Sequence, residues 1–191
     1  MMKYFRLTTI LLVFAFTAGA LISPHSASAA SAAELDRDAQ KALGDLYVKS
    51  SLAKTMGEKA IGILVFPAIV KGGFIVGGQY GEGALIKDGK AVAYYNTIAA
   101  SYGLQAGLQK FGYALFFMTD SALKWLDKSD GWEIGVGPSI VVVDAGAAAS
   151  MTSTTLQSDI YAFFFDQKGL MAGIGLQGTK ITKLGKTPPS D

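Results

Sequence analysis

The spacing of hydrophobic and polar positions divides the chain into a helical part and a strand-rich part, which meet near Gly57. Between Ala33 and Lys54, apolar or small side chains recur every three or four residues, which places them on one face of a helix. A helix at a membrane surface usually has a cleanly basic polar face, whereas this one mixes lysines with Asp36, Asp38 and Asp45. The pattern therefore favours a helix packed on a sheet over a helix lying on a membrane. The apolar face consists of Leu35, Ala39, Ala42, Leu43, Leu46, Ser50 and Ala53.

The rest of the chain has the patterns of β-strands. Some segments are short continuous apolar runs, and others alternate between apolar and polar or glycine positions. Lys87-Asp88-Gly89-Lys90 contains the Asp-Gly pair of a tight hairpin turn, and a second hairpin is expected to turn at Asp166–Gly169. A short helix is expected near 120–128, with Thr119 or Asp120 as its N-cap. The expected strands are 61–66, 72–86, 91–103, 111–118, 132–143, 159–165 and 169–181.

Glycine is unusually frequent, with 23 among 191 residues against a usual share of ~7%. Several glycines stand at even spacing inside the expected strands, where they leave room for tight curvature or for the close approach of another backbone. The segment 173–178 matches G-x-G-x-x-G, but a strand-like stretch and Pro188 and Pro189 follow it instead of a helix. We therefore expect no nucleotide site. The evenly spaced glycines are Gly77, Gly81, Gly135, Gly137, Gly173 and Gly175.

Together these patterns predict an α+β fold. Its main part is a strongly curved, mostly antiparallel, glycine-rich sheet or partly closed barrel. A long N-terminal helix is expected to pack on this sheet, and a short helix is expected near 120–128.

The first 29 residues have the layout of a secretory signal peptide rather than of a folded segment. Lys3 and Arg6 precede an apolar run over 7–22, and Ala27-Ser28-Ala29 fits the small-residue cleavage rule. The run is shorter than the ~20 residues needed to span a bilayer, and no cysteine follows it that could receive a lipid. We therefore expect an exported protein, periplasmic or secreted, with a single domain over 30–191.

Removal of this signal would also remove the only histidine, His25, and two of the basic residues. Fifteen basic and fifteen acidic residues then remain, so the formal net charge is zero, and the chain has no cysteine. These features exclude thiol and histidine catalysis, disulfides and the usual nitrogen and sulfur ligands of zinc or haem, so we expect no metal and no cofactor. A neutral chain whose single arginine is Arg37 is not expected to bind nucleic acid.

Two features could carry catalysis. Ser51–Lys54 and Ser121–Lys124 fit the S-x-x-K pattern of serine enzymes, but the partner motifs Ser-Asp-Asn and Lys-Thr-Gly are absent. Glu82 falls on the apolar face of the 72–86 strand if its alternation is unbroken. It is then a buried carboxylate that needs hydrogen-bond partners, with Tyr80, Gln79, or Tyr94 and Tyr95 across the hairpin as candidates, unless a bulge at the neighbouring glycines turns it outward. A catalytic role ranks behind both alternatives because no second acid can be placed near Glu82, and we expect no enzyme.

The lysines form two loose groups, one at the helix end and first strands and one at the C-terminus. Exposed lysines usually only keep a surface hydrated, and a surface for anionic phospholipid headgroups is the sharper alternative. The first group contains Lys49, Lys54, Lys59 and Lys71, and the second contains Lys180, Lys183 and Lys186.

Three separated stretches resemble the SYLF domain, a lipid-binding module of bacteria and eukaryotes. They are KAIGILVFPAIVKGGFIVGGQYGEGALIKDGKAVAYYN (59–96), ASYGLQAGLQ (100–109) and DIYAFFFDQKGLMAGIGLQGTKI (159–181). The resemblance extends over roughly Glu34 to Leu184. It implies a non-enzymatic module that binds phospholipids, phosphoinositides in eukaryotes, through a basic amphipathic N-terminal helix. Some eukaryotic members also bind and bundle actin.

Carried over to this chain, the helix contacts implied by the resemblance are Lys41, Lys49 and Lys54, with Lys59 just beyond. The acidic residues of the helix dilute the basic face, and an exported bacterial protein meets neither actin nor phosphoinositides. Anionic bacterial phospholipid or a single acyl chain is therefore the expected ligand. The alternative is an envelope scaffold or stress-related module whose partner is a protein. An apolar groove with a basic rim would favour the lipid hypothesis, and a flat patch without a cavity would favour the protein hypothesis.

Overall fold

The structure is a computed structural model of the whole chain, and it describes residues 30–128, 130–143, 157–168, 176 and 178–188. The expected signal segment, 1–29, lies outside these residues, as do Gly173 and Gly175. The elements are α2 (Ala32–Lys49), α3 (Ser51–Gly57), β1 (Gly62–Lys87), β2 (Lys90–Phe117), α4 (Asp120–Leu123), the 3₁₀ helix η2 (Lys124–Asp127), β3 (Trp132–Glu133), β4 (Ile140–Val143), β5 (Ile160–Lys168) and β6 (Lys180–Leu184).

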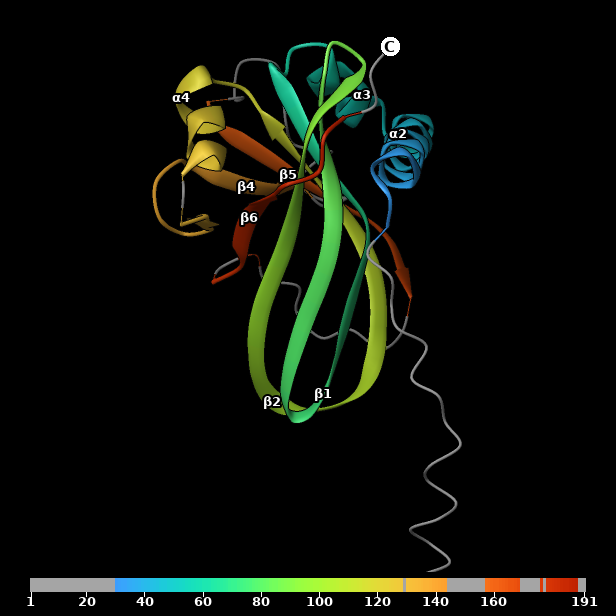
Figure 1. Cartoon of the computed structure of the whole chain (residues 1–191), viewed down its shortest axis with the longest axis vertical. Coiled ribbons are helices and arrows are strands. Elements are labelled where there is room, and N and C mark those ends of the chain that lie inside the picture. Colours follow the sequence, from blue (N-terminus) through green and yellow to red (C-terminus); the bar gives the residue numbers. More distant parts are fainter. Residues whose placement is uncertain (1–29, 129, 144–156, 169–175, 177, 189–191) are drawn as a thin grey trace, which may run out of the picture.

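A long hairpin of β1 and β2, bent over on itself, dominates the fold (Figure 1). The strands pair antiparallel from Gly62 opposite Phe117 to Lys87 opposite Lys90. The half of β2 near its start pairs with β6, and the half near its end pairs with β5. The bent hairpin therefore provides four strand segments of a curled, mostly antiparallel half-barrel of eight strand segments.

The hairpin is sharply bent, so each of its strands has two halves, which we call arms. Residues on the two arms of one strand meet inside the curl. The phenol of Tyr113 donates a 2.8 Å hydrogen bond to the hydroxyl of Thr97, and both side chains are buried on the same strand, β2. Glycines permit the same approach within β1, because a Cβ at Gly83 would collide with the Val65 carbonyl and the Phe66 ring. The expected use of evenly spaced glycines for close backbone approach is confirmed at Gly81, where an added Cβ would lie 2.8 Å from the Ala68 carbonyl oxygen.

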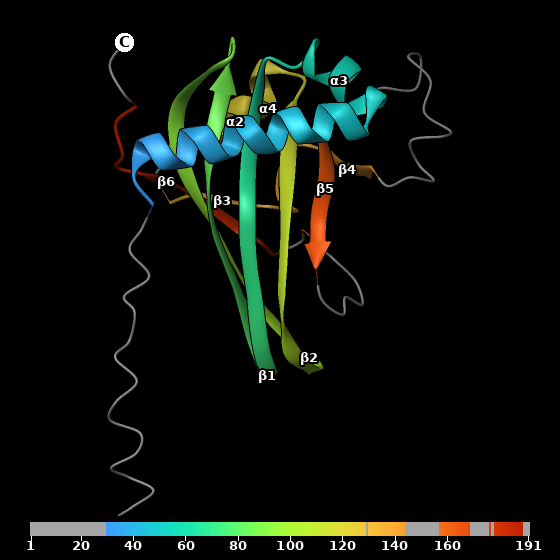
Figure 2. The same ribbon diagram turned by 90° about the vertical axis from the view of Figure 1, so that its right-hand side faces the viewer.

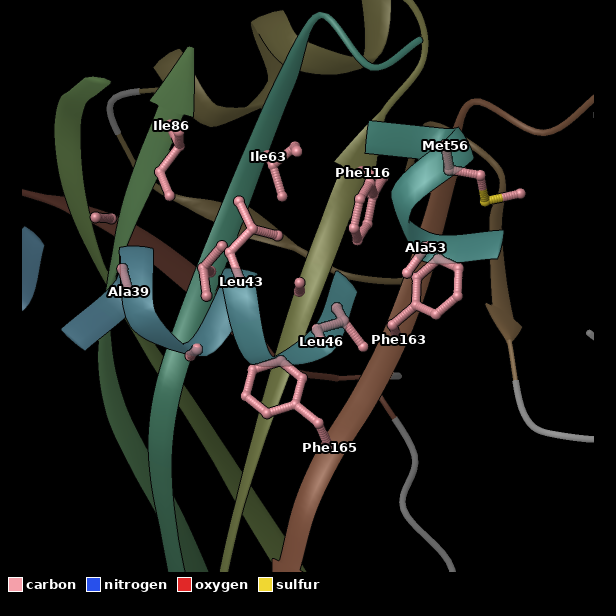
Figure 3. Close-up of a cluster of buried hydrophobic side chains, with 14 of the residues drawn as sticks. Ala39, Leu43, Leu46, Ala53, Met56, Ile63, Ile86, Phe116, Phe163 and Phe165 are labelled. Atoms are coloured by element: carbon pink, nitrogen blue, oxygen red, sulfur yellow. The ribbon is translucent and has the colours of Figure 1, made fainter. Parts of the chain in front are cut away.

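The core consists of two clusters on opposite faces of the sheet, because neighbouring residues of a strand point to opposite sides. Ile63 and Val65 of β1 join the cluster beneath α2 and α3, whereas Leu64 and Phe66 join the other cluster. We name these sides the helix face and the second face. Figure 2 shows α2 crossing the strands, and Figure 3 shows Leu43 and Leu46 of this helix among the buried side chains of the helix face. The second face is covered by α4, η2, β3 and β6.

The N-terminal helix packs on the sheet, as the mixed charge of its polar face predicted. It begins at a capping box, in which the Ser31 hydroxyl accepts from the Glu34 amide and the Glu34 carboxylate accepts from the Ser31 amide. Leu35, Ala39, Ala42, Leu43 and Leu46 are buried, at roughly 1.5–3 kcal/mol for each large side chain.

The expected single helix over 33–54 is two helices, because Ser50 interrupts it. Ser50 has an extended backbone (φ −138°, ψ 105°), and its hydroxyl accepts a 3.1 Å hydrogen bond from the Ala53 amide, which starts α3. A serine hydroxyl can accept a hydrogen bond from a nearby backbone amide, and this bond favours the start of a new helix over continuation of the first. No helix among the described residues is long and apolar enough to cross a membrane.

The turn at Lys87–Lys90 and the short helix are confirmed. Asp88 (φ 50°) and Gly89 (φ 75°) both have positive φ, as a two-residue type I′ hairpin turn requires. The hydroxyl of Thr119 caps the short helix by accepting from the Ala122 amide. Thr119 is therefore the N-cap, and the helix continues as η2 to Asp127.

Three expected strand boundaries were wrong. Pro67 does not end a strand, because an irregularity between Phe66 and Ile69 accommodates it within the 26-residue β1. Likewise 91–103 and 111–118 are parts of one strand, β2. The expected strand 132–143 is divided into β3 and β4, because Gly135 and Gly137 have positive φ (110° and 102°) and form a turn. These two glycines therefore serve a turn and not an alternating strand.

The turn expected at Asp166–Gly169 does not begin at Asp166, because β5 continues to Lys168. Asp166 has a positive φ of 51°, and the pairing of β5 with β2 is irregular between Lys110 and Gly112. Asp166 thus lies at a local irregularity of a continuing strand.

Candidate functional site

The lysines of the two N-terminal helices differ in their partners. Lys41 forms an ion pair with Asp45 (2.6 Å), and Lys49 forms one with Asp166 (2.8 Å). In each case the hydrogen bond to the carboxylate raises the pKa of the lysine. Lys54 and Lys59 are exposed and form no ion pair with the residues that the structure describes. The lysines of this region without an ion pair among the described residues therefore lie on α3 and just beyond it, where the exposed Glu58 also stands.

An exposed apolar side chain lies where α2 meets α3. Val48 is 89% exposed, the largest fraction among the exposed large hydrophobic side chains of the described residues. A single exposed valine is ordinary on a protein surface. Here it stands one residue before Lys49 and six before Lys54. We name Val48, Lys49, Lys54 and Lys59 the α2–α3 corner, which combines an apolar side chain with lysines.

The other expected lysines do not join this corner. Lys71 lies within β1 opposite Gln109, and Lys180 lies on β6 opposite Glu133. Lys183 is 3.5 Å from Asp127 of η2, which belongs to the second face of the sheet. The structure therefore places α3 and Lys183 on opposite faces, and the expected lysines do not form one continuous site.

Glu82 is a largely buried carboxylate with two partners. Its side chain is 10% exposed, and the pairing of β1 with β2 is regular from Ile75 to Leu85, so no bulge turns it outward. The Tyr80 phenol donates to one oxygen (2.7 Å), and the Lys186 ammonium donates to the other (2.5 Å). Partial burial and the hydrogen bond to this carboxylate raise the pKa of Tyr80 to about 12.

Lys186 connects three distant parts of the chain at this point. Besides Glu82, its ammonium donates a 2.6 Å hydrogen bond to the carbonyl of Ala30, just before α2. The sequence places Lys186 in a group of C-terminal lysines but gives no sign of its partner, because 104 residues separate the pair. This arrangement holds the segment before α2 and the segment after β6 against β1. It satisfies the carboxylate with cationic and phenolic donors, which makes Glu82 a structural residue.

The described residues contain no group of three or more acidic, histidine or cysteine side chains that could hold a metal ion. The serines of the two S-x-x-K stretches have ordinary structural positions. Ser51 begins α3, where its carbonyl accepts from the Thr55 hydroxyl (3.0 Å), and Ser121 lies within α4, where its hydroxyl is 3.1 Å from that of Thr119. Among the residues that the structure describes, neither serine has a hydrogen bond to a lysine that could activate it.

A surface cavity of about 290 Å³ lies on the second face, at the turn end of the hairpin. Lys87, Asp127 and Lys183 supply its charged groups. Sequence reasoning missed this cavity because its lining comes from the hairpin, from the α4–η2 segment and from β6. The rest of the lining is aliphatic or aromatic: Leu85, Val92, Ala93, Tyr95, Leu123 and Leu126.

Comparison with known protein families identifies the C-terminal half of the chain. Residues 98–187 match the family model Ysc84, described as "Las17-binding protein actin regulator". This segment therefore matches the Ysc84 (SYLF) domain family. The resemblance noted in the sequence is confirmed there. A search of curated proteins found no match.

The Ysc84 segment includes most of β2, the α4–η2 segment, β3 to β6, and Lys186. Domains of this family are associated with lipid binding and are generally non-catalytic binding modules. The α2–α3 corner and Glu82 lie N-terminal to the matched segment, whereas Lys183 and Asp127 lie inside it.

Proposed function

We propose that the chain is an exported, non-enzymatic lipid-binding protein that contacts anionic phospholipid through the α2–α3 corner. One observation supports the choice of this corner above the others: Lys54 and Lys59 are exposed without an ion pair among the described residues, and the segment that carries them follows the exposed Val48 in the chain. Lys41 and Lys49, in contrast, have carboxylate partners that compensate their charge.

The corner suits the headgroup region of a bilayer better than its hydrocarbon interior. Each lysine near an anionic surface contributes about 1 kcal/mol, and the attraction extends about one Debye length, ~10 Å at 0.1 M salt. The exposed valine near the end of α2 can enter the headgroup region, while α2 keeps its apolar face on the sheet. This contact requires neither the helix to undock nor a membrane-spanning segment.

Export is part of the proposal and is supported by the sequence of residues 1–29. Their basic start, apolar run and Ala27-Ser28-Ala29 are the features that a signal peptidase recognises. Fractionation of cells that express the full chain, followed by N-terminal sequencing of the exported form, tests this part. A protein that starts at Ala30 outside the cytoplasm is the expected result, and an unprocessed cytoplasmic protein would contradict export.

Lipid binding is tested by co-sedimentation of the chain from Ala30 onward with vesicles of neutral or anionic phospholipid at low and high salt. Binding to anionic vesicles alone, lost at high salt, is the expected result. Salt-resistant binding to both kinds of vesicle would contradict headgroup recognition by lysines. Failure to bind either kind would favour a protein partner, an alternative that the family description "Las17-binding protein actin regulator" supports.

A further inference from the structure

We propose that the cavity on the second face binds a small monoanionic amphiphile, a fatty-acid anion with one short alkyl chain. The inference rests on the proposed lipid-binding function and assigns that function a second site. The cavity and the α2–α3 corner lie on opposite faces of the sheet, since Leu126 belongs to one core cluster and Met56 of α3 to the other. The two sites can therefore be tested separately.

The charges around the cavity suit a monoanion. The lining includes two lysines, Lys87 and Lys183, and one carboxylate, Asp127. Lys183 and Asp127 are 3.5 Å apart with side chains 55% and 67% exposed, so their pair is weak and can open at little cost. Lys87 forms no ion pair with the residues that the structure describes. The surplus is one positive charge, which a single carboxylate would neutralise.

The lining and the size of the cavity suit the alkyl chain of the proposed ligand. Leu85 and Ala93 of the hairpin and Leu123 and Leu126 of the α4–η2 segment offer an alkyl chain a surface without competing polar groups. A volume of about 290 Å³ is at the lower end of the range for small-molecule sites, ~300–1,000 Å³. One short chain suits this space, and the two chains of a phospholipid do not.

The first measurement is a calorimetric titration of the chain from Ala30 onward with hexanoate, octanoate and decanoate below their micellar concentrations. Each methylene that enters the cavity should strengthen binding about fourfold until the space is filled. Decanol, which has the chain without the charge, should bind at least about fivefold more weakly than decanoate, because the lysines gain nothing from it. Decanol binding as tightly as decanoate would overturn the proposal.

Variants then locate the site. Lys87→Gln should weaken decanoate binding to the level of decanol, whereas Lys124→Gln, at an exposed lysine of η2 that does not line the cavity, should leave it unchanged. Val92→Trp should block the mouth of the cavity. Its matched control is Val142→Trp on β4, because both valines are 44% exposed and tolerate a large side chain equally. Equal decanoate binding by the two tryptophan variants would overturn the proposal, provided that both unfold at the wild-type urea concentration.

The two sites fail in distinguishable ways. A protein that binds anionic vesicles but shows no saturable decanoate binding contradicts the cavity proposal alone. A protein that binds decanoate through Lys87 but no vesicles supports the cavity and contradicts the proposed contact at the α2–α3 corner.

Discussion

The ammonium of Lys186 lies 2.5 Å from the carboxylate of Glu82, and the two side chains are only 21% and 10% exposed. Lys186 also donates to the Ala30 carbonyl, so the residues just before α2, the last part of β1 and the segment after β6 meet at one ion pair. Removal of one member of such a pair leaves the other charge without compensation in a poorly hydrated place. The ion pair is therefore expected to matter for stability far more than the exposed pairs of the helices.

Lys186→Met should lower the free energy of unfolding by about 3 kcal/mol, because Glu82 keeps its charge and loses its cation. The double variant Glu82→Gln/Lys186→Met should lose less than the sum of the two single variants, since no charge is then left unpaired. Urea unfolding measures all three. Lys183→Met is the control, because its pair with Asp127 is exposed and should contribute below about 1 kcal/mol. Strict additivity of the two single variants would show that the pair is not coupled.

Gly83→Ala should destabilise the curled sheet by about 1–3 kcal/mol, the usual cost of overpacking. The added methyl would collide with the Val65 carbonyl and the Phe66 ring, and neither the backbone nor the buried ring can move far. Gly78→Ala is the matched control on the same strand, because its methyl would lie 3.7 Å from the Ala99 carbonyl oxygen, an ordinary contact. Equal urea midpoints for the two variants would show that the arms of β1 do not approach as closely as described.

The sequence predicted those parts of the fold that depend on local patterns. The helical period located the buried face of α2, and Asp88-Gly89 located a hairpin turn, because only a few residue types accept two successive positive φ angles. The break at Ser50 was missed, since serine is also tolerated inside a helix. Pro67 was wrongly taken as a strand end, because a bulge that accommodates a proline depends on the partner strand.

The candidate sites were harder to predict because distant segments form them. The sequence marked Glu82 as either a buried carboxylate or one turned outward by a bulge, and it offered Tyr80, two residues away on the same face, as one of four candidate partners. It could not pair Glu82 with Lys186, and it could not divide the lysines between two faces of the sheet. That division depends on the bend of the hairpin, which brings β6 to one half of β2 and β5 to the other.

Asp159 should make stability depend on pH in the acidic range. Its carboxylate accepts hydrogen bonds from the Ser139 amide (3.0 Å) and hydroxyl (2.9 Å) and from the Thr119 hydroxyl (3.3 Å). The hydrogen bonds from Ser139 lower the pKa of Asp159 in the folded protein. A lowered folded-state pKa stabilises the protein above the unfolded-state pKa, and this stabilisation is lost as the pH falls through the folded-state value.

The wild type should therefore have a higher urea midpoint than Asp159→Asn at neutral pH, and the difference should shrink once the pH falls below about 4. Asp130→Asn, at an exposed position, controls for the loss of one negative charge. A difference that stays constant down to pH 2 would show that the ionised form of Asp159 is not preferentially stabilised by Ser139.

Lys54→Gln/Lys59→Gln should weaken binding to anionic vesicles by about 2 kcal/mol, or about thirtyfold, because each lysine near the surface contributes about 1 kcal/mol. The salt dependence should flatten at the same time, since fewer charges remain to be screened. Neither lysine has an ion pair among the described residues, so the urea midpoint should not change. Co-sedimentation over a range of lipid concentrations measures the affinity.

The single variants Lys54→Gln and Lys124→Gln separate position from charge, since each removes one exposed lysine, the first on the helix face and the second on η2. Weaker vesicle binding by Lys54→Gln alone would locate the contact at the α2–α3 corner. If both variants lost the same affinity, the membrane would respond to net charge and not to this corner. If neither lost any, the contact would have to be sought among lysines that the fold places elsewhere, beginning with Lys180 on β6, whose partner strand carries the exposed Ile98.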